Sequence, residues 1–283
     1  MNDANKKLEI IRREIDELDN ELLALINRRA QLAKKVAEVK DDEGSAHYYR
    51  PEREAEVLRS LVEGNDGPLP GEHIARIFQE IVSACRALQK PLAVVYLGPE
   101  GTFSERAALK HFGHAIDSRP VDSIGAVFRQ VESGGGDYGV VPIENSTEGV
   151  VGHTLDMFVS SGLSICGEVE LRIHPGSTTR FVVIGRQAAG ATGRDKTSVL
   201  FSSKDRPGAL YELLQSFKKR DINMTRIESR PSRRGNWNYV FYVDFDGHVA
   251  DANVSAALAE LEELAPFFKS LGSYPRCDPS AAQ

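Results

Sequence analysis

The feature of this sequence that most limits its possible folds is a long heptad repeat near its beginning. Apolar residues follow one another at alternating spacings of three and four, and the register continues across one gap. The positions of this apolar stripe are Leu8, Ile11, Ile15, Leu18, Leu22, Leu25, Leu32, Val36 and Val39. A helix of this length spans on the order of 50 Å, and the roughly 40 helical residues that follow are too few to cover it. We therefore expect a second copy of the chain to pack along the stripe.

Arg29 fills the gap in the stripe. A guanidinium group at a position that otherwise holds leucine is costly to bury unless an anion meets it. Lys40 lies eleven residues later, about three helical turns, so it shares nearly the same face as Arg29. These two cations on one face indicate an anionic partner.

The remaining sequence divides into further helices and two α/β segments. Two amphipathic helices follow the repeat, the first with Pro51 at an early position, so we assign 1–91 to a helical domain. Strands and helices then alternate, which predicts a domain with a parallel sheet over 92–190. After a linker at 186–195, residues 196–275 show the βαββαβ order of the ferredoxin-like split motif. The expected fold class is therefore multidomain, α and α/β.

Polar residues gather where the predicted strands of the middle segment end. One buried strand runs into "PEGTFSERAALKHFG", and another ends in "YGVVPIENS". In open sheets of this kind the ligand site forms at the carboxyl ends of the strands. The residues so placed are Thr102, Ser104, Glu144, Asn145 and Ser146.

Charge and composition argue against several classes of protein. The chain has 35 Lys and Arg against 41 Asp and Glu, whereas nucleic-acid binders usually carry a basic face. No apolar run reaches 18 residues, and the N-terminus lacks a signal-peptide core, so we expect a cytoplasmic protein without a membrane span. The cysteines, Cys85, Cys166 and Cys277, lie too far apart to indicate a zinc site or a disulfide framework.

Five short motifs carry a resemblance to a known family. They are "GPEGTFSE", "GVVPIENSTEGVV", "TTRF", "GAL" and "ESRP", in this order. Through them the chain resembles, from about residue 6 to about residue 275, the bifunctional P-proteins, which join chorismate mutase, prephenate dehydratase and a C-terminal ACT regulatory domain. The resemblance implies an enzyme of phenylalanine biosynthesis that uses no cofactor and forms a homodimer or a higher homo-oligomer. It also implies chorismate, prephenate and phenylalanine as small-molecule ligands.

The helical segment resembles the all-helical chorismate mutases, which are intertwined dimers. Their reaction rearranges a dianion, so it is accelerated chiefly by cations that hold the two carboxylates in the reactive geometry. By resemblance, Arg29 binds one carboxylate and Arg12 of the second copy binds the other. Arg53 supports the carboxylate end of the site.

The same resemblance assigns hydrogen-bonding groups around the substrate. Lys40 and Gln89 would meet the ether oxygen, and Glu54 would take the substrate hydroxyl. Two matches are imperfect, because Arg50 stands where some members have an acid and Cys85 where some have a serine. Taken singly, most of these charged residues would equally suit the solvated face of a coiled coil; the joint match favours a site.

The middle segment resembles the prephenate dehydratases. Their reaction removes water and CO2 from a ring that becomes aromatic, so the departing hydroxyl must be protonated and the carboxylate aligned. By resemblance, Thr179 is the proton donor, and Arg180 and Phe181 complete its motif. The residues of the substrate pocket would include Thr102, Ser104, Glu144, Asn145 and Ser146. Without the family match, Thr179 would read as an ordinary hairpin residue and "GPEGTFS" as a plain glycine-rich turn.

The C-terminal segment resembles phenylalanine-binding ACT domains, in which the ligand sits between two ACT domains of a dimer. A small residue at the start of a helix lets backbone N–H groups approach a ligand carboxylate. The residues that match the two ligand motifs are Gly208, Ala209, Leu210, Glu228, Ser229, Arg230 and Pro231.

The segment "LRIHPGSTTRFVVIG", at 171–185, departs from the family. It reads as a strand, a Pro-Gly turn and a strand, whereas in the family the chain crosses here to a second lobe and returns just before "TTRF". A block on the order of 80 residues is missing at a junction near 174–176. We expect a truncated form of the two-lobed, periplasmic-binding-protein-like fold, in which 169–173 and 180–184 pair as a hairpin.

This departure bears on the dehydratase activity. A cleft with one wall cannot exclude water and lacks half of the groups that orient prephenate. The leading interpretation is a competent mutase, a weak or absent dehydratase, and phenylalanine binding at the ACT domain. Two alternatives remain open: an oligomer that supplies the missing wall and retains both activities, and a non-catalytic phenylalanine sensor.

Overall fold

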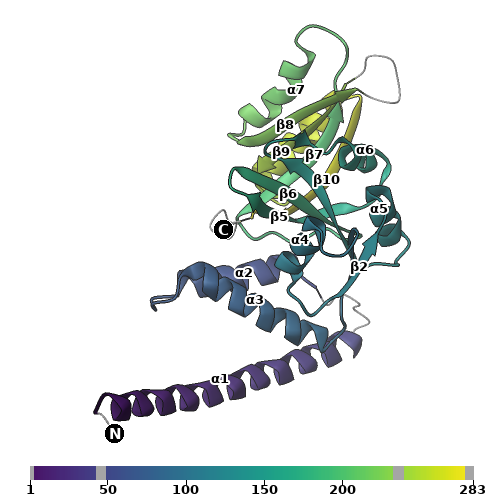
Figure 1. The fold of residues 1–283 in the computed structure, drawn as a ribbon. Helices are drawn as coiled ribbons and strands as arrows, with labels where there is room; N and C mark the ends of the chain where they lie inside the picture. The colour runs from purple at the N-terminus through teal and green to yellow at the C-terminus, as the bar shows by residue number, and fades with distance from the viewer. Residues whose placement is uncertain (1–2, 43–48, 232–238, 278–283) are drawn as a thin grey trace.

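The first unit of the fold is helical. The structure, a computed structural model, describes residues 3–42, 49–231 and 239–277. The helices of this unit are α1 (Asp3–Asp42), α2 (Pro51–Glu63) and α3 (Gly71–Ala87). α1 extends away from the rest of the molecule, and α2 and α3 lie between it and the other units (Figure 1). The long helix and the two shorter ones predicted from apolar spacing are confirmed.

The apolar stripe of α1 faces solvent over most of its length. Leu18, Leu22 and Leu25 are each more than half exposed. The partly buried positions among the described side chains of α1 are Arg29, Ala30, Ala33 and Ala37. None of the helices in the described part of the chain is both long and apolar enough to cross a membrane. The stripe therefore remains a surface that a packing partner would cover.

The second unit is built on a mixed sheet. Its elements are β1 (Ala93–Leu97), α4 (Phe103–Phe112), β2 (Asp117–Val121), α5 (Ile124–Glu132), β3 (Tyr138–Asn145), β4 (Gly149–Val150), α6 (Gly152–Ser160), β5 (Ser164–His174) and β6 (Ser177–Gly185). The strand order is β2-β1-β3-β6-β5, with β4 paired to β3. β1 runs parallel to β2 and β3, but β6 runs antiparallel to β3 and β5. The predicted parallel sheet is thus confirmed for β1, β2 and β3. β5 and β6 pair antiparallel, as the predicted hairpin requires, because a two-residue connection permits only this pairing.

The hairpin between β5 and β6 closes through Pro175 and Gly176. Gly176 has a φ of 88°, and proline fixes φ at about −65°, which together fit a type II turn. A type II turn does not match the twist of hairpin strands, and the pairing register shifts beside it, between Arg172 and His174. The predicted hairpin is confirmed, and this bulge takes up the mismatch of its turn.

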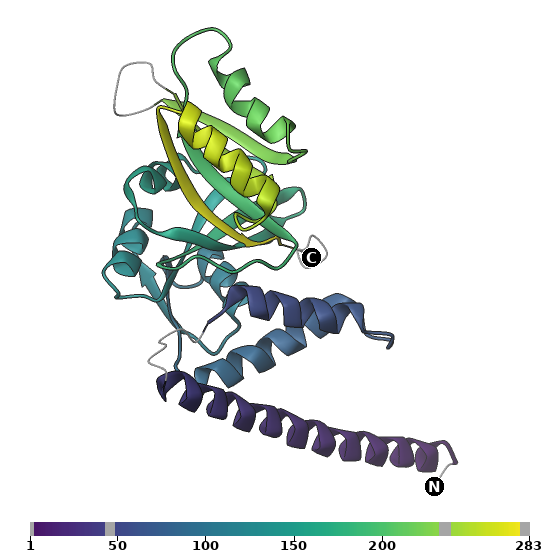
Figure 2. The same cartoon turned by 180° about the vertical axis from the view of Figure 1, so that it is seen from behind.

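The third unit has the predicted βαββαβ order. Its elements are β7 (Asp195–Ser202), α7 (Ala209–Lys218), β8 (Met224–Pro231), β9 (Tyr239–Asp246), α8 (Ala252–Leu264) and β10 (Phe267–Pro275). The strand order is β10-β7-β9-β8, and α7 and α8 cover one face of this sheet (Figure 2). Alternation along β7 sends Val199 and Phe201 toward these helices and Leu200 toward the second unit. The sheet is therefore buried on both faces.

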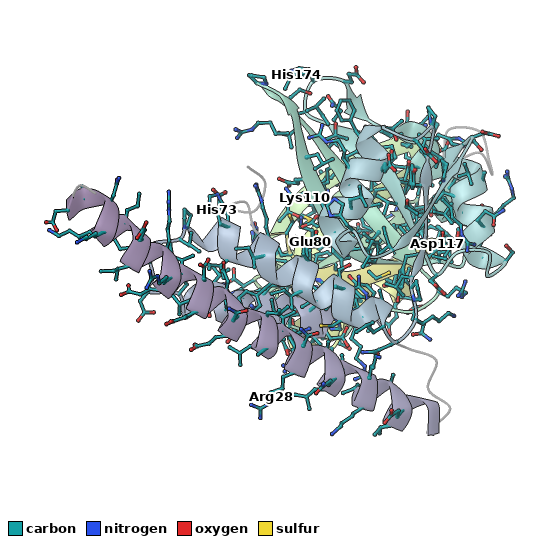
Figure 3. The ribbon with its side chains drawn as sticks, turned by 60° about the horizontal axis from the view of Figure 1, so that its bottom comes forward. Arg28, His73, Glu80, Lys110, Asp117 and His174 are labelled. Atoms are coloured by element: carbon teal, nitrogen blue, oxygen red, sulfur yellow. The ribbon has the colours of Figure 1, made fainter. Side chains whose placement is uncertain are left out.

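Helix α3 caps the end of α4, so the first and second units are firmly joined. The last carbonyl groups of a helix have no partner within the helix. Here the Gln79 side-chain amide donates to the carbonyls of Lys110 and His111, both at 2.6 Å. Figure 3 shows this junction, with Glu80 of α3 close to Lys110 of α4, and His174 at the distant tip of the β5–β6 hairpin.

Gly113, directly after α4, is required by this junction. Its φ of 74° and ψ of 180° fall in a region that is essentially restricted to glycine, and an added Cβ would lie 2.4 Å from Cβ of Ser83. We expect Gly113→Ala to lower the free energy of unfolding by about 3 kcal/mol, measured by urea denaturation. The matched control Gly193→Ala also has positive φ but has open space around the added Cβ, so it should cost about 1 kcal/mol. Equal losses would contradict the close contact between α3 and α4.

Candidate functional site

A cavity of about 170 Å³ opens where α1, α2 and α3 meet. The residues that line it are Arg29, Ala33, Arg50, Arg53, Glu54, Val82, Cys85, Arg86 and Gln89. Five of the predicted mutase residues, from all three helices, therefore lie around one cavity. Its four arginines face a single carboxylate, which makes it electropositive and suited to a small dianion.

Two predicted mutase residues are not part of this cavity. Arg12 is exposed on α1, and it lies 17 residues, or about 25 Å, before Arg29 along the helix. It cannot reach the cavity of its own chain, so its predicted role depends on a second copy. The side chain of Lys40 lies outside the described residues.

Glu54 is held by Arg86, a residue that the sequence analysis did not single out. Arg86 donates to Oε1 of Glu54 at 2.5 Å, and their side chains are 4% and 21% exposed. Burial raises the pKa of Glu54 above its ordinary value, while the charges of Arg86 and Arg29 oppose this rise. A signal for Arg86 was present, because it follows Phe78 and Val82 at spacings of four along the inward face of its helix.

Gln89 stands at the same cavity with an unsatisfied polar atom. Its Oε1 is buried and, among the described residues, has no hydrogen-bond partner. A buried polar group without a partner is costly. The side-chain oxygen of Gln89 is therefore available to accept a hydrogen bond from a ligand in the cavity.

A second group of predicted residues lies at one edge of the mixed sheet. β1 and β3 are parallel and end at this edge, and the antiparallel β6 begins there. Thr102 donates from its hydroxyl to the carbonyl of Leu97 at 3.1 Å, and Ser104 is buried in the first turn of α4. Glu144 ends β3 beside Asn145, and its carboxylate lies 3.0 Å from Nε of Arg226. The predicted dehydratase residues before β6 thus meet its first residues at one edge.

Asn145 fixes the hydroxyl of Thr179. Its Oδ1 accepts from the backbone N–H groups of Thr147 and Glu148, at 2.8 and 3.0 Å. These bonds orient the amide, so that its Nδ2 donates to Oγ1 of Thr179 at 2.7 Å. Because the oxygen of Thr179 accepts this bond, its own O–H is left to donate to another group. Ser146 ties the two strands together instead, through backbone and side-chain bonds to Thr178.

Arg180 and Phe181 point away from this edge in different directions. Side chains alternate along a strand, so Arg180 faces the third unit while Thr179 and Phe181 face α4. Phe181 is 2% exposed and belongs to the core under α4. Arg180 donates to Glu168 at 3.0 Å and to Asp244 of β9 at 2.7 Å.

Arg180 is part of a buried network of charges between the second and third units. Lys196 of β7 donates to both oxygens of Glu168 at 2.8 Å, so two cations and two carboxylates balance. Burial alone would raise the pKa of Asp244, but the charge of Arg180 and the hydroxyl of Ser198 lower it below its ordinary value. The network holds the two units together only while Asp244 is ionised.

Removing this carboxylate should weaken the fold in a pH-dependent manner. Because its pKa is depressed, Asp244 stabilises the fold above about pH 4, and this contribution is lost as the pH falls below that. We expect Asp244→Asn to lower the free energy of unfolding by about 3 kcal/mol at pH 7, and by clearly less at pH 3. The matched control Asp246→Asn, on the same strand but partly exposed beside Arg276, should cost under about 1 kcal/mol. Urea denaturation at both pH values measures this, and a pH-independent loss would contradict it.

The third unit has its own cavity, of about 220 Å³, at the start of α7. Its walls are Ser203, Lys204, Asp205, Arg206, Gly208, Ala209, Leu210, Tyr211 and Tyr239. Gly208 caps α7 with a φ of 80°, and the three predicted GAL residues all line the cavity. The four ESRP residues end β8, an edge strand, and are not among these walls. Arg230 instead approaches Asp156 of α6, with 3.4 Å between Nε and Oδ1.

Within the described ranges, no group of three or more His, Cys, Asp and Glu side chains is placed to hold a metal ion.

Three family models match successive parts of the chain. They are chorismate mutase type II over residues 11–90, prephenate dehydratase over 94–176 and the ACT domain over 197–263. The chain is 40% identical to the bifunctional chorismate mutase/prephenate dehydratase of Pseudomonas aeruginosa, covering 95% of this chain and 98% of that relative. It is 38% identical to the Neisseria gonorrhoeae protein of the same name, covering 93% and 96%.

Solved structures show the same relationship for part of the chain. Prephenate dehydratase from Streptococcus mutans is 35% identical with a TM-score of 0.59, covering 65% of this chain and all of the other. Prephenate dehydratase from Arthrobacter aurescens in complex with L-Phe is 27% identical with a TM-score of 0.59, covering 67% and 94%.

The relatives also show that this chain is short. The alignment with the Pseudomonas aeruginosa protein runs over 357 positions, whereas 95% of these 283 residues is about 269 residues. About 88 positions of that alignment therefore have no residue of this chain. The match to the prephenate dehydratase family stops at residue 176, inside the turn between β5 and β6.

Proposed function

The chain belongs to the family of bifunctional chorismate mutase/prephenate dehydratases, and we propose that its mutase is competent while its dehydratase is impaired. Its mutase, dehydratase and ACT regions make it an enzyme of phenylalanine biosynthesis. The observation that carries the proposal is the contrast between its two candidate sites. The mutase cavity unites residues from three helices, whereas the dehydratase match stops at a two-residue turn.

The mutase cavity holds the dianion chorismate by its charges. Arg29 binds one carboxylate and Arg53 supports the carboxylate end, which holds the substrate in the reactive geometry. Gln89 donates to the ether oxygen as its bond breaks, and Lys40 adds positive charge there. Glu54 accepts the hydrogen bond of the substrate hydroxyl. The reaction is a rearrangement within one molecule, so the site supplies position and charge but no nucleophile.

A second copy of the chain completes this site. The exposed stripe of α1 supports such a partner, because an apolar surface of this length favours burial against another helix. In an antiparallel pairing of two α1 helices, Arg12 of the partner subunit binds the second carboxylate. The active form is therefore a homodimer or a larger homo-oligomer.

The dehydratase edge retains its proposed proton donor but has one wall. The bond from Asn145 to Oγ1 of Thr179 supports this role, because it leaves the Thr179 O–H free to donate to the departing hydroxyl. Thr102 and Ser104 would line the same side of prephenate, whereas Glu144 pairs with Arg226 and lies opposite Arg180, on the face toward the ACT domain. Without the second lobe, water enters and the ring is not aligned, so turnover falls steeply.

Assays of both reactions test this proposal. We expect the purified protein to consume chorismate, and we expect phenylpyruvate formation from prephenate to be at least about 100-fold slower than in a two-lobed relative. Arg29→Ala should lower mutase kcat/KM about 100-fold or more, because a cation that holds a carboxylate is lost.

Protein concentration provides the control for this assay. A dehydratase rate that rises steeply with concentration would mean that an oligomer supplies the missing wall. Substantial prephenate turnover at every concentration would overturn the argument from the single wall. A protein without mutase activity that still binds phenylalanine would be a sensor instead.

The ACT domain binds phenylalanine at the start of α7, and calorimetry tests this. We expect saturable L-phenylalanine binding that Gly208→Ala weakens about tenfold or more, because the strained backbone N–H groups no longer meet the ligand carboxylate. Gly193→Ala carries the same kind of strain, with φ of 78° against 80° and open space at both positions, and should bind normally. Equal weakening would show a general loss of fold.

A further inference from the structure

We propose that Arg86 is a positioning residue of the mutase site, and that the truncated dehydratase unit holds it in place. This inference rests on the proposed role of Glu54 in binding the substrate hydroxyl. It means that the mutase of this chain depends on the neighbouring unit, even though that unit has lost much of its own cleft.

The guanidinium group of Arg86 bridges the two units. One nitrogen donates to Oε1 of Glu54 at 2.5 Å, and another donates to the carbonyl of Phe112 at 2.6 Å. Glu54 belongs to the mutase cavity, whereas Phe112 is the last residue of α4 in the dehydratase unit. The side chain of Arg86 is only 4% exposed. A planar fork with both ends occupied sets its acceptor in one orientation, which a lysine cannot do.

Aromatic rings of the dehydratase core fix the plane of this fork. The guanidinium carbon lies 5.1 Å from the ring centre of Tyr49 and 6.0 Å from that of Phe112. Tyr49 precedes α2, but its side chain is buried in the core of the second unit, and its hydroxyl is hydrogen bonded to Nε2 of His111 at 2.8 Å. Burial and the charge of Arg86 lower the pKa of His111 to about 4, so this ring is neutral at pH 7. The arginine thus rests on a neutral aromatic wall.

The end of α4 that receives Arg86 is itself secured by α3. Gln79 and Arg86 lie on one face of α3 and together bind the carbonyls of the last three residues of α4. The C-terminal carbonyls of a helix carry partial negative charge, which favours a cation. The dehydratase helix therefore acts as a fixed acceptor for Arg86.

Charge explains why the position of Arg86 matters to Glu54. Burial raises the pKa of Glu54, and the charge of Arg86 is the largest influence that opposes this rise. The titratable and charged groups around Glu54 are Arg29 of α1, Arg50 directly before α2, Arg53 of α2, Cys85 and Arg86 of α3, and Tyr49. Arg29, the other arginine whose charge opposes this rise, is assigned to a substrate carboxylate, which leaves Arg86 to keep Glu54 ionised when the cavity fills. Since both of its ends are occupied, Arg86 acts through Glu54 and does not contact the substrate.

The pH profile of the mutase tests this role. We expect Arg86→Met to lower kcat/KM for chorismate and to move the acid limb of its pH profile upward by about one pH unit or more, because Glu54 loses a nearby positive charge. Arg86→Lys should leave the acid limb close to its wild-type pH, because it keeps the positive charge, but it should not restore the full kcat/KM. Arg76→Met makes the same change on the same helix outside the mutase cavity and should leave the profile unchanged. A lower rate with an unmoved limb would overturn the inference.

A remote variant tests the contribution of the dehydratase unit. Gln79→Ala removes two bonds to the end of α4 without touching the mutase cavity. We expect it to raise KM for chorismate about tenfold, since a small displacement of a positioning group is enough to cost this much. Ile77→Ala, at an exposed position of the same helix, should leave KM unchanged. An unchanged KM in Gln79→Ala would show that the mutase is independent of α4.

Unfolding measurements separate this inference from the proposed function. If the wild-type protein lacks mutase turnover, the proposed function fails, and urea denaturation still tests the contact. Arg86→Met should lower the urea midpoint more in the wild-type background than in Glu54→Gln, because only the former leaves a buried carboxylate without its partner. Equal shifts in the two backgrounds would show that Arg86 and Glu54 are not coupled.

Discussion

A buried guanidinium group must be surrounded by negative charge or carbonyl oxygens, and this requirement shapes two junctions of the molecule. At the first junction, Arg86 joins Glu54 to the last turn of α4. At the second, Arg180 joins Glu168 to Asp244 in the ACT domain. Each arginine has one partner in its own unit and gains the other only when two units are assembled. The free energy of unfolding of each unit therefore includes contacts with its neighbour.

The short turn at Pro175 and Gly176 is compatible with these junctions because β5 pairs with β6 in regular register from Gly167 to Arg172. The bulge lies next to the turn, at the tip of the hairpin, whereas Glu168 and Arg180 lie in the regularly paired part of the two strands. The face of the hairpin that meets the ACT domain is thus complete without a second lobe. Loss of the lobe affects the edge that holds Thr179 and spares the surface that holds the units together.

Much of the architecture could be predicted from sequence because it depends on local spacing. The heptad repeat predicted α1, and strand and helix order predicted the ACT fold. The partners of the buried arginines could not be predicted, because Arg180 and Asp244 are 64 residues apart and periodicity says nothing of such pairs. Adjacent residues of the TTRF motif also lie on opposite faces of the sheet, because side chains alternate along a strand and this places Arg180 and Thr179 on different sides. The TTRF motif therefore contains both a candidate site residue, Thr179, and a residue of the contact with the ACT domain, Arg180.

Two elements of the dehydratase unit connect its candidate site to its neighbours. α4 begins at the edge that holds Thr102 and ends where Arg86 binds it. β6 (Ser177–Gly185) carries Thr179 near its start and then Arg180, which binds the ACT domain on the opposite face. An effect of phenylalanine on the mutase cavity needs a physical connection between the sites. It can travel through these contacts, through a second copy of the chain, or through α2, which contacts β10 and pairs Glu63 with Arg194 of the linker. The truncated unit therefore has a structural task that does not depend on its own catalysis: it is the part of the chain that binds both Arg86 and Asp244.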